Sequence, residues 1–305
     1  MKSNVNISIS NLITFIIVII VIAIIVIIFF NNKNLLYNDN VSFNNVSYIP
    51  SLKSLNVKIF VDSANLDFVS EVATDDLFHG FTTNPNLLHK EKIKNYTFYA
   101  KKFLNIITDR PVSFQVISDD MNEMYKQGRK LASLGKNVFV KVPIINSKGE
   151  SCTPVIKKLV DNGIKVNITG VLTIQQIKSL HNVLSPNVQN FISIWAGRIS
   201  ETGIDHIPAV SQMINYIHSN MPETKVIWAS VRSANDIFVA NKIGCDIITV
   251  TPDIIKKLPH LGKSLNHMSS HIISEFLFSS RESRLSLDDI DDIDENNNYT
   301  YNNTL

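Results

Sequence analysis

Short runs of apolar and β-branched residues alternate with helix-like stretches eight times between residues 57 and 250, and this repetition constrains the fold more than any other feature. Strands that alternate with helices build βαβ units and a parallel sheet. Eight units in about 225 residues have the usual size of a TIM (β/α)8 barrel. The predicted strands are Val57–Val61, Gly80–Thr82, Val112–Val116, Val138–Val142, Ile164–Thr169, Phe191–Ile194, Val226–Ala229 and Ile247–Val250.

A doubly wound open sheet is the alternative fold. Such sheets carry a glycine-rich turn of the form GxGxxG after a strand, and none follows any predicted strand here. The nearest thing to a phosphate loop is the run Gly262-Lys263-Ser264, but Lys257 stands where that loop needs its first glycine. The barrel is therefore the preferred fold class, with helices predicted at Asp120–Leu134, Thr173–Val183 and Ala234–Lys242 among others.

The fourth predicted strand contains a lysine between apolar residues. Because side chains alternate between the two faces of a strand, Phe139 and Lys141 point to one face while three valines point to the other. Burial among apolar groups lowers the pKa of a lysine, and a neutral amine is a nucleophile towards carbonyls. The alternative is that Lys141 extends along the strand end so that its ammonium group reaches solvent.

Polar residues follow or end most of the predicted strands. In a TIM barrel the chemistry lies at the carboxyl ends of the strands, so these side chains are expected around one mouth. Two arginines, Arg198 and Arg232, follow strands 6 and 7, the usual place for a bound phosphate in such barrels. The other residues of this set are Asp62, Thr82, Thr83, Asn84, Gln115, Lys141, Asn167, Thr169, Ser193 and Ser230.

Five short runs resemble the transaldolase and fructose-6-phosphate aldolase family. They are VDSAN at 61–65, GFTTNPN at 80–86, VKVP at 140–143, AGRI at 196–199 and ASVR at 229–232, in order within a match of roughly residues 58–278. The resemblance implies a TIM barrel, a Schiff base on the lysine of strand 4 and no metal or organic cofactor. It also implies transfer or cleavage of a dihydroxyacetone unit from sugar phosphates, and assembly into homo-oligomers.

The resemblance also assigns roles to single residues. Lys141 would attack the substrate ketone, and Asp62 would exchange a proton with the C4 hydroxyl. Asn84 and Asn167 would hold the lysine and the substrate hydroxyls, and Thr169 would position a water molecule. The remaining predicted substrate contacts are Thr82, Ser193, Trp195, Arg198, Ser230 and Arg232.

Two positions depart from the transaldolase pattern. Gln115 replaces a glutamate that activates the shared water, and an amide can orient water but cannot take its proton. Aldolases of the family have glutamine there together with a tyrosine on strand 6, where this chain has Trp195. The residues therefore leave open three activities: a transaldolase, a fructose-6-phosphate aldolase, and a catalytically degenerate barrel that serves as a membrane-tethered binding module.

The two ends of the chain differ from the middle. Residues 12–30 are uncharged and nearly all apolar, and as a helix they would extend about 28 Å, close to the thickness of a bilayer core. We expect a membrane anchor at 1–33, an Asn/Ser-rich linker at 34–56, a catalytic barrel at 57–280 and a disordered acidic tail at 281–305. This predicts a single-pass membrane protein with a cytosolic barrel; a signal peptide is the second interpretation.

Charge and cysteine content limit the possible binding partners and the redox compartment of the protein. Six acidic residues lie in the last eighteen, so the rest of the chain is moderately basic although the net charge is only +2. No lysine or arginine run indicates nucleic acid binding, and anionic small substrates are favoured. The two cysteines lack metal spacing and favour a reducing compartment. His267 and His271, four residues apart, are the one hint of a metal-dependent aldolase, and no acidic residue stands between them.

Overall fold

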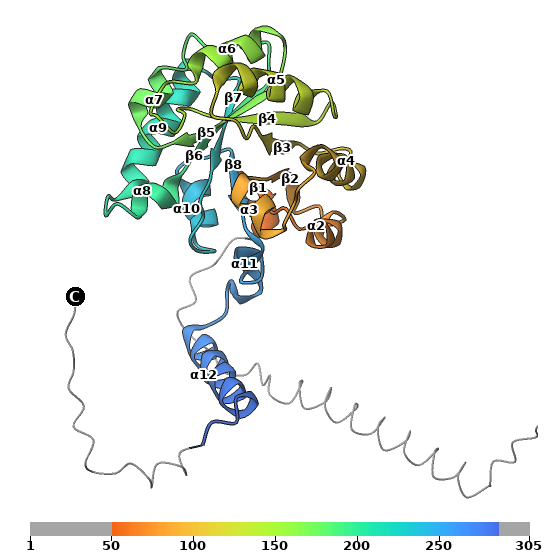
Figure 1. The fold of residues 1–305 in the computed structure, drawn as a ribbon. Helices are drawn as coiled ribbons and strands as arrows, with labels where there is room; N and C mark the ends of the chain where they lie inside the picture. Colours follow the sequence, from red (N-terminus) through yellow and green to blue (C-terminus); the bar gives the residue numbers. More distant parts are fainter. Residues whose placement is uncertain (1–50, 287–305) are drawn as a thin grey trace, which may run out of the picture. The chain divides into compact units, whose positions relative to one another are not determined.

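Eight parallel strands close into a barrel in which each strand pairs with the next and β8 pairs with β1 (Figure 1). The structure is a computed structural model that describes residues 51–286. The closed ring confirms the predicted TIM barrel and excludes the open doubly wound sheet. The strands are β1 (Lys58–Asp62), β2 (Phe78–Thr82), β3 (Val112–Gln115), β4 (Val138–Pro143), β5 (Val166–Val171), β6 (Asn190–Ile194), β7 (Thr224–Trp228) and β8 (Ile247–Val250).

The helices that connect consecutive strands surround the ring (Figure 1). Polar caps start several of them: the Asn84 side chain accepts a hydrogen bond from the Leu87 amide at 3.0 Å, and Pro85 follows in the first helical turn. The helices are η1 (Leu52–Ser54), α2 (Leu66–Val72), α3 (Pro85–Lys90), α4 (Tyr96–Ile106), α5 (Met121–Ala132), α6 (Thr153–Asp161), α7 (Ile174–Lys178), α8 (Ala196–Ser200), α9 (His206–Asn220), α10 (Asp236–Lys242), α11 (Pro252–Ile255), η2 (Leu258–His260) and α12 (Leu265–Glu282).

The chain divides into two compact units. One unit contains the whole barrel and includes the described residues 51–263, and α12 belongs to the other. Within α12 no residue is buried. All of the predicted site residues belong to the barrel unit. The predicted boundaries of anchor, linker, barrel and tail remain predictions.

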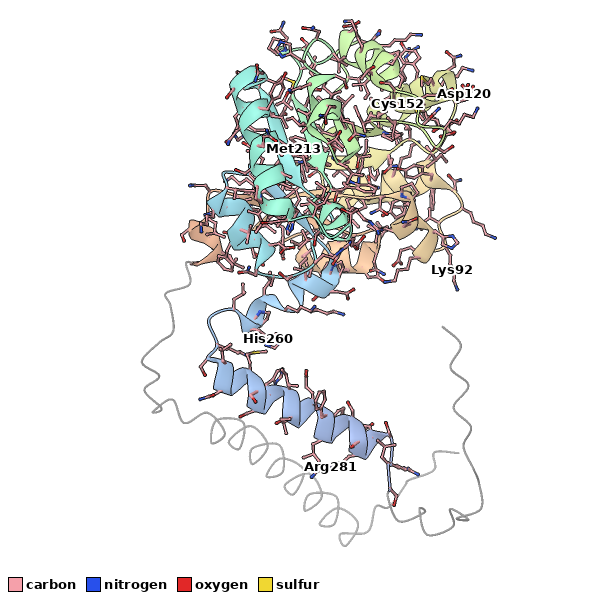
Figure 2. The ribbon with its side chains drawn as sticks, turned by 90° about the vertical axis from the view of Figure 1, so that its left-hand side faces the viewer. Lys92, Asp120, Cys152, Met213, His260 and Arg281 are labelled. Atoms are coloured by element: carbon pink, nitrogen blue, oxygen red, sulfur yellow. The ribbon has the colours of Figure 1, made fainter. Side chains whose placement is uncertain are left out.

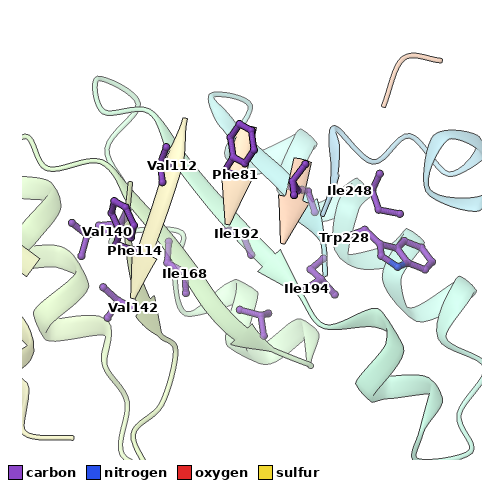
Figure 3. Packing of buried hydrophobic residues seen from close by; sticks show 14 of the residues in the cluster. Phe81, Val112, Phe114, Val140, Val142, Ile168, Ile192, Ile194, Trp228 and Ile248 are labelled. Atoms are coloured by element: carbon purple, nitrogen blue, oxygen red, sulfur yellow. The ribbon is translucent and has the colours of Figure 1, made fainter. Parts of the chain in front are cut away.

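The apolar core has two layers, which follow from the alternation of side chains along each strand. The outward faces of the strands form one large cluster with apolar residues of the helices; Phe81, Val140 and Ile192 of this cluster are labelled in Figure 3. The inward faces contribute a separate cluster at the amino end of the barrel, which we call the barrel floor. Its members are Phe60, Phe139, Phe191, Ile227 and Ile247.

Stacked rings close the barrel floor. Phe139 and Phe191 stack with ring centroids 4.0 Å apart, and Phe60 meets Phe191 edge-on at 6.0 Å. Gly80 makes room for this packing, since a Cβ atom there would lie 2.5 Å from the Phe60 ring. Water is thereby kept from the barrel interior on the side opposite the strands' carboxyl ends.

Both cysteines are free and buried in the described part of the chain. Cys152 lies just before α6 and is labelled in Figure 2. Burial raises the pKa of its thiol to about 11 and that of Cys245 to about 12, so neither is a reactive thiolate at neutral pH.

The predicted single-pass membrane localisation is contradicted and is withdrawn. Among the helices of residues 51–286, none is both long and apolar enough to cross a bilayer. The physical reason is clear in α12, whose eighteen residues include Glu275, Arg281 and Glu282 together with several serines. Residues 12–30, on which the anchor was predicted, lie outside the described residues.

Candidate active site

Strand pairing brings the predicted polar residues to one mouth of the barrel. Side chains that face the interior recur at every second residue, and neighbouring strands are in register there: Gln115 pairs with Lys141, and Lys141 with Asn167. Asp62 pairs with Thr82 in the same way. Residues far apart in sequence therefore share one layer just above the barrel floor.

Lys141 is buried, with only 6% of its surface exposed. Its Nζ donates a hydrogen bond to the Thr83 carbonyl at 3.1 Å, and Phe139 of the barrel floor precedes it on the same face of β4. The ammonium group therefore does not reach solvent, contrary to the alternative considered from sequence. Burial lowers the pKa of Lys141, and the carboxylate of Asp62 opposes this shift without reversing it.

Asp62 stands at the end of β1 and is tied to the next strand. Its Oδ1 accepts a hydrogen bond from the Thr82 hydroxyl at 2.7 Å, and its Oδ2 one from the Asn84 amide at 3.4 Å. Burial raises the pKa of Asp62, and both the Lys141 charge and the Thr82 hydrogen bond counteract the rise. Burial therefore shifts the two pKa values towards each other.

A buried polar network connects β3, β5 and β6 in the barrel interior. The Asn167 amide donates to the Ser113 hydroxyl at 3.0 Å and accepts a hydrogen bond from Ser193 Oγ at 2.7 Å. All three side chains are at most 2% exposed. The network fixes the orientation of the Asn167 amide, because its oxygen and nitrogen both have partners.

Gln115, Thr169 and Trp195 lie on β3, on β5 and just after β6, respectively. The indole Nε1 of Trp195 donates to Thr169 Oγ1 at 3.0 Å, which leaves the threonine hydroxyl proton free for another acceptor. Gln115 and Trp195 line one cavity at the barrel mouth. The backbone carbonyl of Gln115 accepts a hydrogen bond from the Tyr96 hydroxyl at 3.0 Å. Burial raises the pKa of the Tyr96 hydroxyl, so it remains a proton donor.

The two predicted phosphate-binding arginines bind one carboxylate. Arg198 Nη1 lies 2.8 Å from Glu201 Oε2, and Arg232 Nη2 contacts Glu201 Oε1. Ser230, two residues before Arg232, has a left-handed backbone with φ of 64°, which is uncommon for a residue other than glycine. Its carbonyl oxygen is so close to Gly197 that a Cβ there would lie 1.8 Å from it.

A cavity of about 330 Å³ opens at this mouth. Of the predicted site residues, Asp62, Thr82, Asn167, Thr169, Ser193 and Arg232 do not line it directly: most lie in the interior layer beside Lys141, and Arg232 is bound to Glu201. The lining residues are Asn84, Pro85, Asn86, Gln115, Lys141, Trp195, Arg198 and Ser230.

Three residues of the site were missed from the sequence. Thr249 on β8 exchanges a 2.7 Å hydrogen bond with the Thr82 hydroxyl, and Ser113 holds Asn167. Both lie at interior positions that strand alternation could have indicated, two residues from Ile247 and Gln115 respectively. Glu201 had no such signal, since it follows a short helix rather than a strand.

The metal-dependent alternative rested on two histidines of α12. There His271 Nε2 lies 3.4 Å from a carboxylate oxygen of Glu275, one turn further along the helix. No group of three or more histidine, cysteine or acidic residues placed to hold a metal occurs among the residues that the structure describes.

Comparison with known proteins agrees with this geometry. The sequence profile of the family described as "Transaldolase/Fructose-6-phosphate aldolase" matches residues 59–297. The chain belongs to this family. A "Probable transaldolase" of Syntrophomonas wolfei is 32% identical over 203 residues, which are 66% of this chain and 90% of that protein. One of Methanococcus maripaludis is 31% identical over 222 residues, 72% of this chain and 96% of that protein.

This chain is thus an enzyme of the transaldolase and aldolase type, and its family implies sugar phosphate substrates. Among solved structures, N-acetylneuraminate lyase from Mycoplasma synoviae has a TM-score of 0.46 at 9% identity, covering 74% of this chain and 83% of that one. A likeness of this degree adds nothing to the family assignment.

Proposed function

We propose that this transaldolase-family enzyme transfers a dihydroxyacetone unit between sugar phosphates through a Schiff base on Lys141. The main support is the buried Lys141 amine, whose pKa is lowered and which lines a cavity together with Arg198. A neutral amine there can attack a ketone, and an arginine at the same cavity suits a substrate that carries a phosphate.

The proposed reaction begins at C2 of a ketose phosphate. The Lys141 amine adds to the carbonyl carbon, and the carbonyl oxygen takes up protons and leaves as water, which gives an iminium ion. As the C3–C4 bond breaks, its electron pair moves towards the iminium nitrogen, and Asp62 takes the C4 hydroxyl proton. The aldehyde product leaves, and an enamine of dihydroxyacetone remains on Lys141. Its C3 attacks the acceptor aldehyde, Asp62 returns the proton, and water hydrolyses the new iminium ion.

The other residues have supporting roles in this proposal. The Asn84 and Asn167 amides hold the lysine and the substrate hydroxyls, and Thr82 supports Asp62 through its 2.7 Å hydrogen bond. Thr169, Gln115 and Trp195 orient the water that imine formation and hydrolysis require. Ser193 fixes the Asn167 amide, and Arg198, Ser230 and Arg232 bind the substrate phosphate.

Fructose-6-phosphate aldolase activity is the second candidate. Gln115 supports it, because its amide cannot take a proton from water as the glutamate of transaldolases does. Trp195 supports aldolase activity less clearly, because its indole donates a hydrogen bond to Thr169 but does not titrate. In this reaction the enamine on Lys141 would be protonated at C3, and hydrolysis would release free dihydroxyacetone.

Borohydride trapping tests the Schiff base. The full chain is incubated with fructose 6-phosphate and borohydride, and the adduct is located by peptide mass spectrometry, with Lys141→Met as the control. An adduct on Lys141 alone is expected. Bound substrate without any adduct would contradict both activities and support a binding role for the barrel.

Product analysis then separates the two activities. Turnover that requires erythrose 4-phosphate as acceptor is expected for the transferase. Release of dihydroxyacetone at the same rate without an acceptor would assign the aldolase instead.

A further inference from the structure

Glu201 bridges two arginines that follow neighbouring strands of the barrel. Arg198 lies on α8 after β6, and Arg232 follows β7. Each guanidinium contacts a different oxygen of the same carboxylate, Arg198 at 2.8 Å on Oε2 and Arg232 on Oε1. No other acidic side chain is within ion-pair distance of either arginine in the described residues. Glu201 is thus the counter-ion of both.

This arrangement resembles the way two arginines hold a phosphate. Guanidinium groups recognise carboxylate and phosphate through the same paired geometry, because both present oxygens at a similar spacing. The cavity reaches this place through Arg198 and Ser230, which line it together with Lys141. If the ketone of a substrate reaches Lys141, the substrate's phosphate would come to these two arginines. The Glu201 carboxylate already occupies them.

We infer that Glu201 is an internal competitor for the phosphate site, whose carboxylate must leave Arg198 and Arg232 before a substrate phosphate binds both. The inference rests on the proposed function, because it assumes that these arginines take a phosphate. It adds a residue that sets how strongly and how selectively the site binds anions.

The exposure of the three side chains suits a contact that opens. Arg198, Arg232 and Glu201 are 53%, 46% and 44% exposed, and exposed ion pairs are weak and screened by salt. The backbone beneath them is better fixed: the Arg232 amide donates to Asp236 Oδ2 at 2.9 Å, and the Arg198 amide to the Trp195 carbonyl at 2.9 Å. The Glu201 side chain can therefore move away while both arginines stay at the mouth.

Competition by a carboxylate makes the site selective. When a metabolite carboxylate replaces the Glu201 carboxylate on the arginines, the binding free energy does not improve. A phosphate dianion binds more strongly, because it has more charge and three acceptor oxygens. The Glu201 pKa is lowered, first by the Arg198 hydrogen bond, so the competitor stays charged at neutral pH. Weakly binding metabolite carboxylates are excluded in this way, and phosphate affinity is lower than two free arginines would give.

Calorimetric titration of inorganic phosphate tests the inference on the full chain at low ionic strength and pH 8. Glu201→Gln is expected to bind phosphate about five-fold more tightly than the wild type, as expected for two lost exposed ion pairs. Glu201→Ala should change the affinity in the same direction. The difference should shrink in 0.5 M salt, because the pairs are screened there.

Glu123→Gln is the matched control. Glu123 also forms an exposed ion pair at i,i+3, with Lys126 at 2.7 Å, and its side chain is 50% exposed. Its replacement removes the same charge outside the mouth and is expected to leave phosphate affinity unchanged. A similar gain in both variants would mean that net charge, not the bridge, controls binding, and would overturn the inference.

Two further outcomes separate the inference from the proposed function. In the first outcome, Glu201→Gln binds phosphate as the wild type does or more weakly, while Arg198→Met no longer binds it. The carboxylate would then position the arginines, and only the inference would be wrong. Undiminished phosphate binding by both Arg198→Met and Arg232→Met would remove the phosphate site itself, and the inference with it. Borohydride trapping on Lys141 would then still report on the Schiff base independently.

Discussion

The pKa values of Lys141 and Asp62 are shifted in opposite directions by one physical cause. Burial disfavours the charged form of each, so the pKa of the amine falls and that of the carboxyl rises. Their mutual attraction limits both shifts. The proposed Schiff-base reaction requires an amine that is neutral close to working pH. It also requires an acid-base group that titrates close to the same pH.

Replacing the carboxylate should separate these two effects. Asp62→Asn is expected to lower turnover about 10²- to 10⁴-fold, the usual contribution of a general acid-base group. It also removes the charge that raises the pKa of Lys141, so borohydride trapping should reach half its maximal rate at a lower pH than in the wild type. Trapping rates between pH 5 and 10 give the measurement. A midpoint that moves upward would contradict the coupling.

Gly197 is required by the close approach of the Ser230 carbonyl. In Gly197→Ala the new Cβ would lie 1.8 Å from that oxygen, so the backbone around Gly197 and Ser230 must shift. We expect a loss of about 1–3 kcal/mol in the free energy of unfolding and a fall of about 10² in kcat/KM. Denaturant unfolding and steady-state kinetics measure the two effects.

Gly135→Ala is the control for that substitution. Its Cβ would meet only the ends of flexible side chains, Asn137 at 3.0 Å and Leu104 at 3.3 Å. We expect near wild-type kinetics from it. Equal kinetic losses in the two variants would show that the tight contact at Ser230 is not what matters.

The strands were predictable as elements because most of them are short buried runs rich in β-branched residues that recur between helix-like stretches. All eight occur, and β8 has the predicted ends, Ile247 and Val250. β2 begins two residues earlier than predicted, because exposed His79 interrupts the apolar run while Phe78 before it is buried. The inward-facing polar set followed from the same alternation, which is why the sequence could bring Lys141 near Asp62.

Other parts of the site depend on contacts that no sequence period encodes. The Glu201 bridge joins residues that follow β6 and β7, and the left-handed backbone of Ser230 occurs where its carbonyl oxygen closely approaches Gly197 of α8. The lowered pKa of Lys141 was predictable in direction from its apolar strand. The raised pKa of Asp62 was not, because its burial depends on the ring of strands closing around it.

The barrel floor can be tested as an element that keeps Lys141 dry. Phe139→Ala should cost about 3–5 kcal/mol in the free energy of unfolding. It should also admit water beneath Lys141, which would raise the pKa of the amine towards its ordinary value and move the trapping midpoint to higher pH. Phe103→Ala, in the outer core layer, should cost similar stability without moving the midpoint. Equal midpoints in the two variants would contradict the role given to the barrel floor.

At the scale of the whole molecule, function and stability oppose each other at one position. The same burial that suits Lys141 to its proposed role as a nucleophile makes its charged form unfavourable in the folded state, while the unfolded chain keeps the ordinary pKa of 10.5. Below the lowered folded pKa the folded protein carries the full cost of the buried ammonium. The cost declines as pH rises between the two pKa values, since the folded state has then lost its proton, and it vanishes above 10.5.

Lys141→Met should therefore make the protein inactive and more stable. We expect the free energy of unfolding to rise at pH 7, since burial of the ammonium group, which lowers the pKa of Lys141 despite the nearby Asp62, no longer opposes folding when an apolar side chain of similar length replaces it. The gain should shrink as the pH is raised towards 10.5, where the wild-type amine is neutral in both states. Lys126→Met, at an exposed position, should show no such pH dependence. Urea unfolding of both variants between pH 6 and 10 measures the effect, and a gain that grows with pH would mean that the folded protein favours the charged form of Lys141.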